Sequence, residues 1–461
     1  MASGRLQEGD ARLADPGRGR HGRTGRSVTT AVVLLFSLVP PLSVLWLVST
    51  QGVDVPYWDQ WDFLPLIAKA QEGELTLQDL WQPHNEHRLF FPKLIMLALA
   101  WLTDWNIRAE LLTNWVLAAL ALTLVLRLFV VRAEQLRLRA LGWLYIAIGA
   151  ASVFGLSQWQ NWLWGWQLQI FLNVLGVLVT VWVLRPREDR LTAGELFLAA
   201  LSACLSSFSF GTGLMLWVAA VPLVWARAGS TRRRLVMAGV WVSLGALTSS
   251  LYMSGLWGVL AAGDPSFSWR QALHLGAYVA IYLGAPLFAF SGHAALYGGF
   301  GAALAVLGLG AVTWRKGGSG EWAAVWLCLL AYAILAAMMT ATGRIGLGIG
   351  QALSSRYITI GNLFWLGGLG LGLELAASVR SDAARRLLFA AGCGVLALVV
   401  VSGFYGRRQF SDQARRLRSA ASLLTEGSVG TAGEVLYPSE PVLRQRVEVL
   451  RRHGLSVFAD D

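Results

Sequence analysis

Acidic residues, histidines and an arginine concentrate in a short polar stretch of this 461-residue chain, between positions 54 and 88. Asp59 and Asp62 are three positions apart, so on a helix their carboxylates share one face. A second cluster consists of His84, Glu86, His87 and Arg88. A base beside an acid suits proton transfer, and an arginine suits binding of a phosphate. The stretch therefore predicts a site in which Asp59, Asp62 and Glu86 are catalytic acids and the histidines and Arg88 bind substrate.

A structural interpretation of the same residues stays open. Trp58 and Trp61 would share the helix face beside the two acids. Tryptophan-rich helices with solvated acids commonly lie at membrane surfaces, with their indoles on the lipid headgroups. Under this interpretation the two carboxylates only form the solvated face of the helix and have no catalytic role.

Metal binding is a further alternative for this stretch. The carboxylates of Asp59 and Asp62 and the imidazole of His84 are ligands for a divalent cation such as Mg²⁺ or Mn²⁺. Their spacing matches no established metal motif, so the sequence leaves this alternative open.

Residues 157–169 alternate indoles with amides and carry no charge. Indole faces stack on the apolar faces of sugars, and amides hydrogen-bond sugar hydroxyls. The candidate sugar-binding residues are Trp159, Gln160, Asn161, Trp164 and Gln167. An aromatic belt at the membrane surface is the structural alternative.

The glycine-rich segment 343–357 contains Arg344, Arg356 and Tyr357. Guanidinium groups together with the backbone amides of glycines can hold a phosphate. We therefore predict that these three residues bind substrate. Arg356 directly precedes an apolar run, so the alternative is that its side chain extends to the lipid headgroups.

Composition requires an integral membrane protein, because 55% of the residues are hydrophobic, only 14% are charged, and tryptophan occurs 22 times. The net charge of +11 comes from arginines placed between apolar runs, which indicates membrane topology and excludes a nucleic-acid-binding protein. The three cysteines lie inside apolar runs, which predicts no disulfide and no cysteine-based metal site.

Apolar runs long enough to cross a bilayer lie at 28–50, 110–131, 141–158, 166–184, 235–257, 294–313, 321–342, 357–378 and 387–404. The run 194–226 is interrupted at 209–213 and predicts two short helices joined by a tight turn. Two further stretches, 89–103 and 275–291, are ambiguous. If neither crosses, the arginine clusters face the cytoplasm, as the positive-inside rule requires. We therefore expect about eleven spans, against thirteen if both cross.

This solution predicts an all-α bundle with a disordered cytoplasmic tail (1–27), a transmembrane domain (28–404) and a short extracytoplasmic helical tail (405–461). The first outer loop, 51–109, would hold interfacial helices. Lysine occurs only at positions 69, 93 and 316, and this preference for arginine indicates a GC-rich bacterial genome. We therefore expect the bacterial plasma membrane.

The first-loop acids, the segment His87-Arg-Leu-Phe-Phe-Pro and about a dozen spans together resemble the GT-C superfamily of membrane glycosyltransferases. The resemblance covers about residues 28 to 404 and implies an enzyme that uses a polyprenyl-phosphate-linked sugar. It implies that Asp59, or else Asp62, is the general base or helps to hold a divalent ion, and that Arg356, or else Arg344, binds the lipid phosphate. The acceptor would be an envelope glycan, a lipid or a protein.

Two other functions stay open. One is a flippase or transporter of a lipid-linked or anionic solute, with the interrupted helices near Gly211 and Gly343 lining its pathway. The other is a polymerase of glycan repeats, which would use the same outer face.

Overall fold

Helices make up all the regular structure of the residues that the structure describes. A computed structural model describes residues 18–256, 268–315 and 320–459. Over these ranges nine helical segments are long and apolar enough to cross a membrane. Two of them join neighbouring elements: Arg139–Leu163 contains α6 (Arg139–Val153) and α7 (Trp159–Leu163), and Gly165–Leu184 contains a 3-10 turn and α8 (Leu168–Leu184). The others correspond to α5 (Ile107–Leu136), α12 (Thr231–Met253), α14 (Trp269–Phe288), α15 (Gly292–Arg315), α16 (Gly320–Arg344), α17 (Ile358–Ser378) and α18 (Asp382–Thr425). The expected all-helical chain with many candidate membrane spans is therefore confirmed, although these ranges give nine such segments where eleven or thirteen spans were expected.

Shorter apolar helices complete the bundle. They are the part of α1 (Arg18–Gln51) from Leu35 onward, α4 (Phe90–Thr103), α9 (Ala193–Ser207), and the pair α10 (Met215–Ala219) and α11 (Val221–Arg227). The interruption predicted at 209–213 is present, because a 3-10 turn at Gly211–Leu214 separates α9 from α10. A Cβ on Gly213 would lie 2.3 Å from the carbonyl of Ser206, so this close approach requires glycine.

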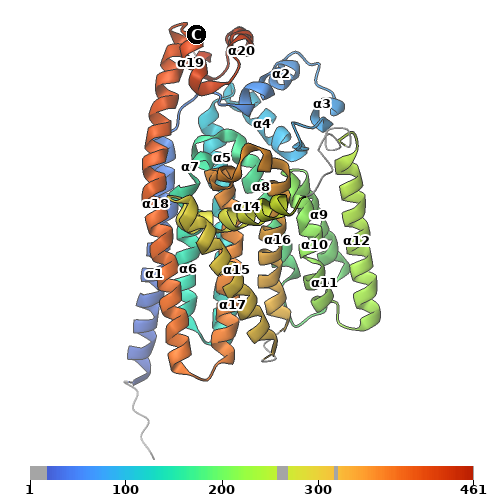
Figure 1. Cartoon of the computed structure of the whole chain (residues 1–461), viewed down its shortest axis with the longest axis vertical. Helices are drawn as coiled ribbons and strands as arrows, with labels where there is room; N and C mark the ends of the chain where they lie inside the picture. The colour runs from blue at the N-terminus through green and yellow to red at the C-terminus, as the bar shows by residue number, and fades with distance from the viewer. Residues whose placement is uncertain (1–17, 257–267, 316–319, 460–461) are drawn as a thin grey trace, which may run out of the picture.

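Arginine-rich connections lie together at one end of the molecule. Arg227 Nη2 is 3.2 Å from Glu195 Oε2, and this ion pair joins the last residue of α11 to the start of α9. Arg132 at the end of α5 forms a buried ion pair with Glu374 near the end of α17, with Nε and Oε1 2.7 Å apart. Figure 1 shows the α11–α12 and α17–α18 connections at the same end as the start of α1.

Polar helices gather at the opposite end, together with the last described residues (Figure 1). They are α2 (Asp59–Gln71), α3 (Leu77–Trp81), α19 (Val429–Leu436) and α20 (Glu440–Arg452). α18 does not end at residue 404 but continues to Thr425, and so carries α19 and α20 beyond the apolar part of the bundle.

The first loop and the C-terminal segment share one apolar core. Trp61 and Leu64 of α2 are buried in the same cluster as Leu436, Leu443 and Leu450. Trp61 is fully buried, so the expectation that its indole rests on lipid headgroups was wrong. The indole instead fixes α2 to the protein, because its burial removes a large apolar surface from water.

The two ambiguous stretches form α4 and α14. α4 ends beside the C-terminal segment, where Ser456 N donates to Asp104 O at 2.8 Å. α5 begins at the same end, because Ile107 N donates to Asp54 Oδ1 at 2.7 Å and Ser456 Oγ donates to the same oxygen at 3.0 Å. α4 therefore does not carry the chain to the arginine-rich end. α14 has the length and composition of a span and packs tightly on α15, with a Cβ on Gly284 only 2.0 Å from Ala295 O.

Candidate functional site

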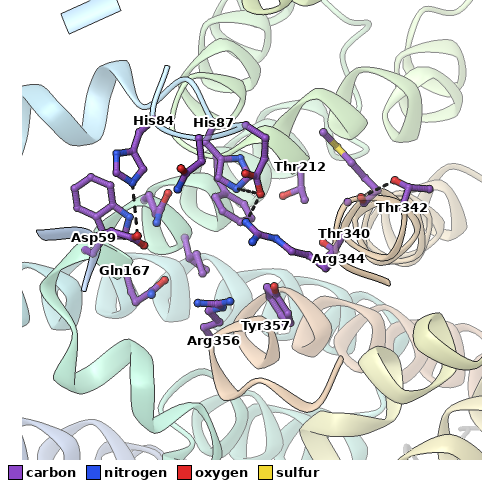
Figure 2. Close-up of a pocket in the computed structure, with 18 of the residues that line it drawn as sticks. Asp59, His84, His87, Gln167, Thr212, Thr340, Thr342, Arg344, Arg356 and Tyr357 are labelled. Carbon is purple, nitrogen blue, oxygen red and sulfur yellow. Dashed lines mark hydrogen bonds and ion pairs between the residues drawn. The ribbon is translucent and has the colours of Figure 1, made fainter. Parts of the chain in front are cut away.

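A cavity of about 540 Å³ lies near the polar end of the bundle. Segments distant in the sequence line it: Asp59, 84–87, Trp164, Trp166, Gln167, Gln169, Ile170, Phe210, Thr212, Tyr252, Met253, 339–340, 342–344, Arg356 and Tyr357. Figure 2 shows the labelled side chains around this space, with the histidines on one wall and Arg356 on another. All three segments singled out in the sequence therefore contribute to one cavity.

Residues 84–87 form a tight turn that presents three ionisable side chains. His84 N donates to His87 O at 2.7 Å, and His87 N donates to His84 O at 2.9 Å. Asn85 has a φ of 50°, a left-handed conformation that asparagine tolerates better than most residues. The turn therefore places His84, Glu86 and His87 along the same wall of the cavity.

Two acid–base pairs lie on this wall. Asp59 Oδ1 is 3.7 Å from His84 Nε2, and Glu86 Oε1 is 3.6 Å from His87 Nε2. Glu86 also forms an ion pair with Arg344 (Figure 2). The pKa of His87 is lowered to about 4, chiefly because the ring is buried; the negative charge of Glu86 opposes this shift and the positive charge of Arg344 adds to it. His87 is therefore neutral near pH 7.

Arg356 is a cation without a carboxylate partner among the residues that the structure describes. Its guanidinium carbon lies 5.9 Å from the ring centre of Trp164 and 5.3 Å from that of Tyr357. Arg344 differs, because Glu86 already neutralises it. An anion in the cavity would therefore be attracted first to Arg356.

The neutral segment 157–169 holds Arg356 in place. Gln160 Oε1 accepts hydrogen bonds from Ser355 Oγ at 3.0 Å and from Arg356 N at 3.3 Å. Asn161 Nδ2 donates to Arg356 O at 3.0 Å and to Thr359 Oγ1 at 2.6 Å. Gln160 and Asn161 therefore position the arginine and do not line the cavity, whereas Trp164 and Gln167 do.

Three other predicted residues also lie outside the cavity lining. Trp159 is half-buried in α7 (Trp159–Leu163). Arg88 is buried, and its Nε donates to Tyr252 O at 3.1 Å, which ties the 84–87 turn to the end of α12. Asp62 is exposed, and its Oδ1 accepts a hydrogen bond from Tyr437 Oη at 2.7 Å. The glycines at 346, 348 and 350 are not part of the lining either, so only Gly343 represents the expected glycine cradle.

Asp59 is the first residue of α2 and lies between two anchored residues. Trp58 has the strained combination of φ 50° and ψ −120°, and its N donates to Leu436 O at 2.9 Å. Gln60 Oε1 accepts from Tyr57 N at 3.2 Å, and Gln60 Nε2 donates to the buried Glu110 at 2.6 Å. These contacts fix the backbone on both sides of Asp59, so the direction of its carboxylate is set in advance.

Sequence reasoning missed the residues that make these anchors. Glu110, Gln60 and Leu436 lie far apart in the chain and carry no motif. One signal was available, because an acid in the first turn of an apolar helix needs a buried hydrogen-bond partner. Glu110 has two, since its other oxygen accepts from Trp105 Nε1 at 2.9 Å.

The three predicted metal ligands lie together. Ligand atoms of Asp59, Asp62 and His84 are within 4.8 Å of one another. Two ligands on opposite sides of an ion are separated by roughly 4.2 Å, so the side chains fit an ion after a small contraction. Carboxylate with imidazole favours Mn²⁺ over Mg²⁺, because Mg²⁺ prefers oxygen ligands alone. His84 Nε2 is buried without a hydrogen bond, which is consistent with a ligand role.

Comparison with known proteins gives no relative, since no family model, no curated protein and no solved structure matches this chain. The site must therefore be interpreted from its own geometry.

Proposed function

We propose that the protein is a membrane glycosyltransferase that takes a sugar from a polyprenyl-phosphate donor, as the resemblance to the GT-C superfamily implies. The observation that carries the proposal is a single cavity lined by a carboxylate, Asp59, and by a guanidinium, Arg356, which has no carboxylate partner within the described ranges. The two groups come from different elements. Glycosyl transfer needs a base for the acceptor hydroxyl and positive charge for the departing phosphate.

The arrangement of charges supports an orientation in which the arginine-rich end faces the cytoplasm. The N-terminus is then cytoplasmic, and the cavity and the C-terminal segment are extracytoplasmic. We favour eleven crossings, with α4 and α14 not counted, in a bacterial plasma membrane. Polyprenyl-phosphate sugars presented at the outer face would reach the cavity from the bilayer.

In the proposed inverting reaction, Asp59 accepts the proton of an acceptor hydroxyl while that oxygen bonds to the anomeric carbon of the sugar. The bond between the anomeric carbon and the phosphate oxygen breaks, and its electron pair leaves with the polyprenyl phosphate. Arg356 binds the phosphate as its charge increases. A divalent ion held by one oxygen of Asp59 together with Asp62 and His84 would supply further positive charge and would leave the second Asp59 oxygen to accept the proton.

Apolar residues offer a place for the first part of the lipid chain. Ile170, Phe210, Met253 and Met339 line the cavity beside its polar wall. Met253 lies at the end of α12 and Met339 in α16, two apolar helices of the bundle. Methionine side chains are flexible and suit an irregular lipid chain.

A flippase or transporter is supported less well by the same structure. Transporters place ionisable groups along a pathway through the spans. Glu195 of α9 and Glu374 of α17, two acids within apolar helices, form ion pairs with Arg227 and Arg132 at the arginine-rich end. A polymerase of glycan repeats would use the same cavity and differs in its donor.

Asp59→Asn tests the proposal. The purified protein is reconstituted with a radiolabelled polyprenyl-phosphate sugar and an acceptor extract, and both transfer and translocation of the sugar are measured. Transfer should fall at least about a thousandfold, because the amide cannot accept the proton. Asp104→Asn is the matched control, since Asp104 is exposed and has a left-handed backbone that asparagine tolerates. Full transfer by Asp59→Asn, or translocation without transfer by the wild type, would remove the proposal.

A further inference from the structure

We propose that residues 164–169 form a subsite for an uncharged, hydroxyl-bearing sugar, the group that is transferred. The inference rests on the proposed function, because it names the sugar class of the same donor. Trp164, Gln167 and Gln169 line the cavity and are only 3%, 1% and 5% exposed. Trp164 Nε1, Gln167 Oε1 and Gln169 Oε1 are buried and form no hydrogen bond with any residue that the structure describes.

Such atoms indicate a missing ligand. A buried polar group without a partner costs about 1–3 kcal/mol, so native proteins rarely keep several of them close together. Here three occur within six residues and all belong to the lining of one cavity. A bound group that donates and accepts hydrogen bonds at each position would remove the cost.

Two amides earlier in the same segment make hydrogen bonds within the protein. Gln160 Oε1 accepts a hydrogen bond from Ser355 Oγ at 3.0 Å, and Asn161 Nδ2 donates to Thr359 Oγ1 at 2.6 Å. Neither amide lines the cavity, and Asn161 keeps one atom, Oδ1, buried without a partner among the described residues. Of the unpartnered atoms in this segment, those that line the cavity and that a ligand there could reach belong to Trp164, Gln167 and Gln169.

The chemistry of the unpartnered groups selects the ligand. Each amide can both donate and accept, and the indole N–H of Trp164 donates, which together match a ring of hydroxyl groups. None of the three carries a charge. Trp166, in the same lining, packs against His84 with ring centres 4.8 Å apart and limits the width of the subsite.

The charges elsewhere in the cavity are consistent with an uncharged sugar at residues 164–169. In Figure 2, Gln167 lies on the side of the cavity that carries Asp59, and Arg344 lies on the other side. A carboxylate on the sugar would be repelled by Asp59, while an ammonium group would compete with the acceptor for it. The donor therefore places its phosphate at Arg356 and a neutral sugar against residues 164–169.

Equilibrium binding of short-chain lipids tests the subsite. The full chain in nanodiscs of uncharged lipid is titrated with farnesyl phosphate and with farnesyl phosphoryl esters of glucose, mannose, galactose and arabinose. Glucuronic acid and glucosamine esters serve as charged comparisons. We expect the best neutral ester to bind at least about tenfold more tightly than farnesyl phosphate and than either charged ester, since one hydrogen bond to a buried amide contributes about that factor.

Gln167→Leu and Gln169→Leu should each reduce this preference about tenfold and leave the binding of farnesyl phosphate unchanged. Gln445→Leu, on the exposed surface of α20, should change neither. Without lipid, Gln169→Leu should keep or raise the thermal midpoint, because it replaces an unpartnered amide by an apolar group of similar size. A lower midpoint would mean an internal partner for Gln169 and would overturn the inference.

The two proposals fail differently. If no neutral ester binds more tightly than farnesyl phosphate, the sugar subsite is wrong, even where Asp59-dependent transfer persists. If a charged ester binds best, the sugar class is wrong. If neither farnesyl phosphate nor any ester binds, both the subsite and the proposed function are overturned.

Discussion

Two substitutions of Arg356 distinguish the contribution of its positive charge from that of its planar guanidinium group. Arg356→Lys keeps a positive charge but loses the planar pair of donors that can bind two phosphate oxygens at once. Arg356→Ala loses both. The backbone at this position stays fixed in either variant, because Gln160 and Asn161 bind the N–H and the carbonyl of Arg356 and not its side chain.

The size of the effect follows from the surroundings of the guanidinium. A hydrogen bond to a charged group contributes about 1.5–3 kcal/mol, and the half-buried position of Arg356 favours the lower value. Arg356→Lys should therefore lower kcat/KM for the donor about tenfold. Arg356→Ala, which loses two such bonds, should lower it about a hundredfold.

The thermal midpoint should respond differently to replacement of the two cavity arginines. Arg356 has no carboxylate partner among the described residues, so Arg356→Ala leaves no acid unpaired and should not change the thermal midpoint. Arg344→Ala removes the partner of Glu86 and should lower it.

The assay is initial-rate transfer from a radiolabelled polyprenyl-phosphate sugar in proteoliposomes, with the thermal midpoint of each variant measured in parallel. Arg444→Lys, in an exposed ion pair of α20, is the matched control and should change neither quantity. Unchanged kcat/KM in Arg356→Ala would refute the assignment of the phosphate to this residue. A loss of kcat/KM that only follows a loss of folded protein would refute it as well.

Three further predictions concern acidity, metal and topology. The pKa of His87 is about 4 in the folded protein and 6.5 in the unfolded chain, so the unfolded chain binds the proton first and stability should fall as the pH falls from about 6.5 to 4. His87→Asn should flatten that part of a plot of thermal midpoint against pH. An unchanged slope would contradict the burial of His87. Mn²⁺ should raise the midpoint of the wild type but not of Asp62→Asn, since the amide is a weaker ligand, and an equal shift in both would exclude Asp62 from a metal site. A reporter enzyme that works only outside the cytoplasm should be inactive when fused near Gln135, and activity there would reverse the proposed orientation.

The positions of the apolar helices could be predicted from the sequence, because a helix that faces lipid must be apolar along its whole length. A membrane-crossing helix needs a local run of apolar residues, so the run 110–131 predicted α5 without knowledge of its neighbours. The interruption at 209–213 was equally local, because two glycines and a serine cannot continue an apolar helix well. The residue types of the site were visible for the same reason, since polar clusters stand out in an apolar chain.

Tertiary structure alone decided how these polar residues are used. Gln160 and Gln167 looked equivalent, yet one holds the Arg356 segment and the other lines the cavity. Asp59 and Asp62 are three positions apart, but only Asp59 belongs to the lining. These differences depend on contacts between segments hundreds of residues apart, such as Trp58 N with Leu436 O. No local pattern encodes such contacts, because they form only when helices pack and every buried polar group must find its partner.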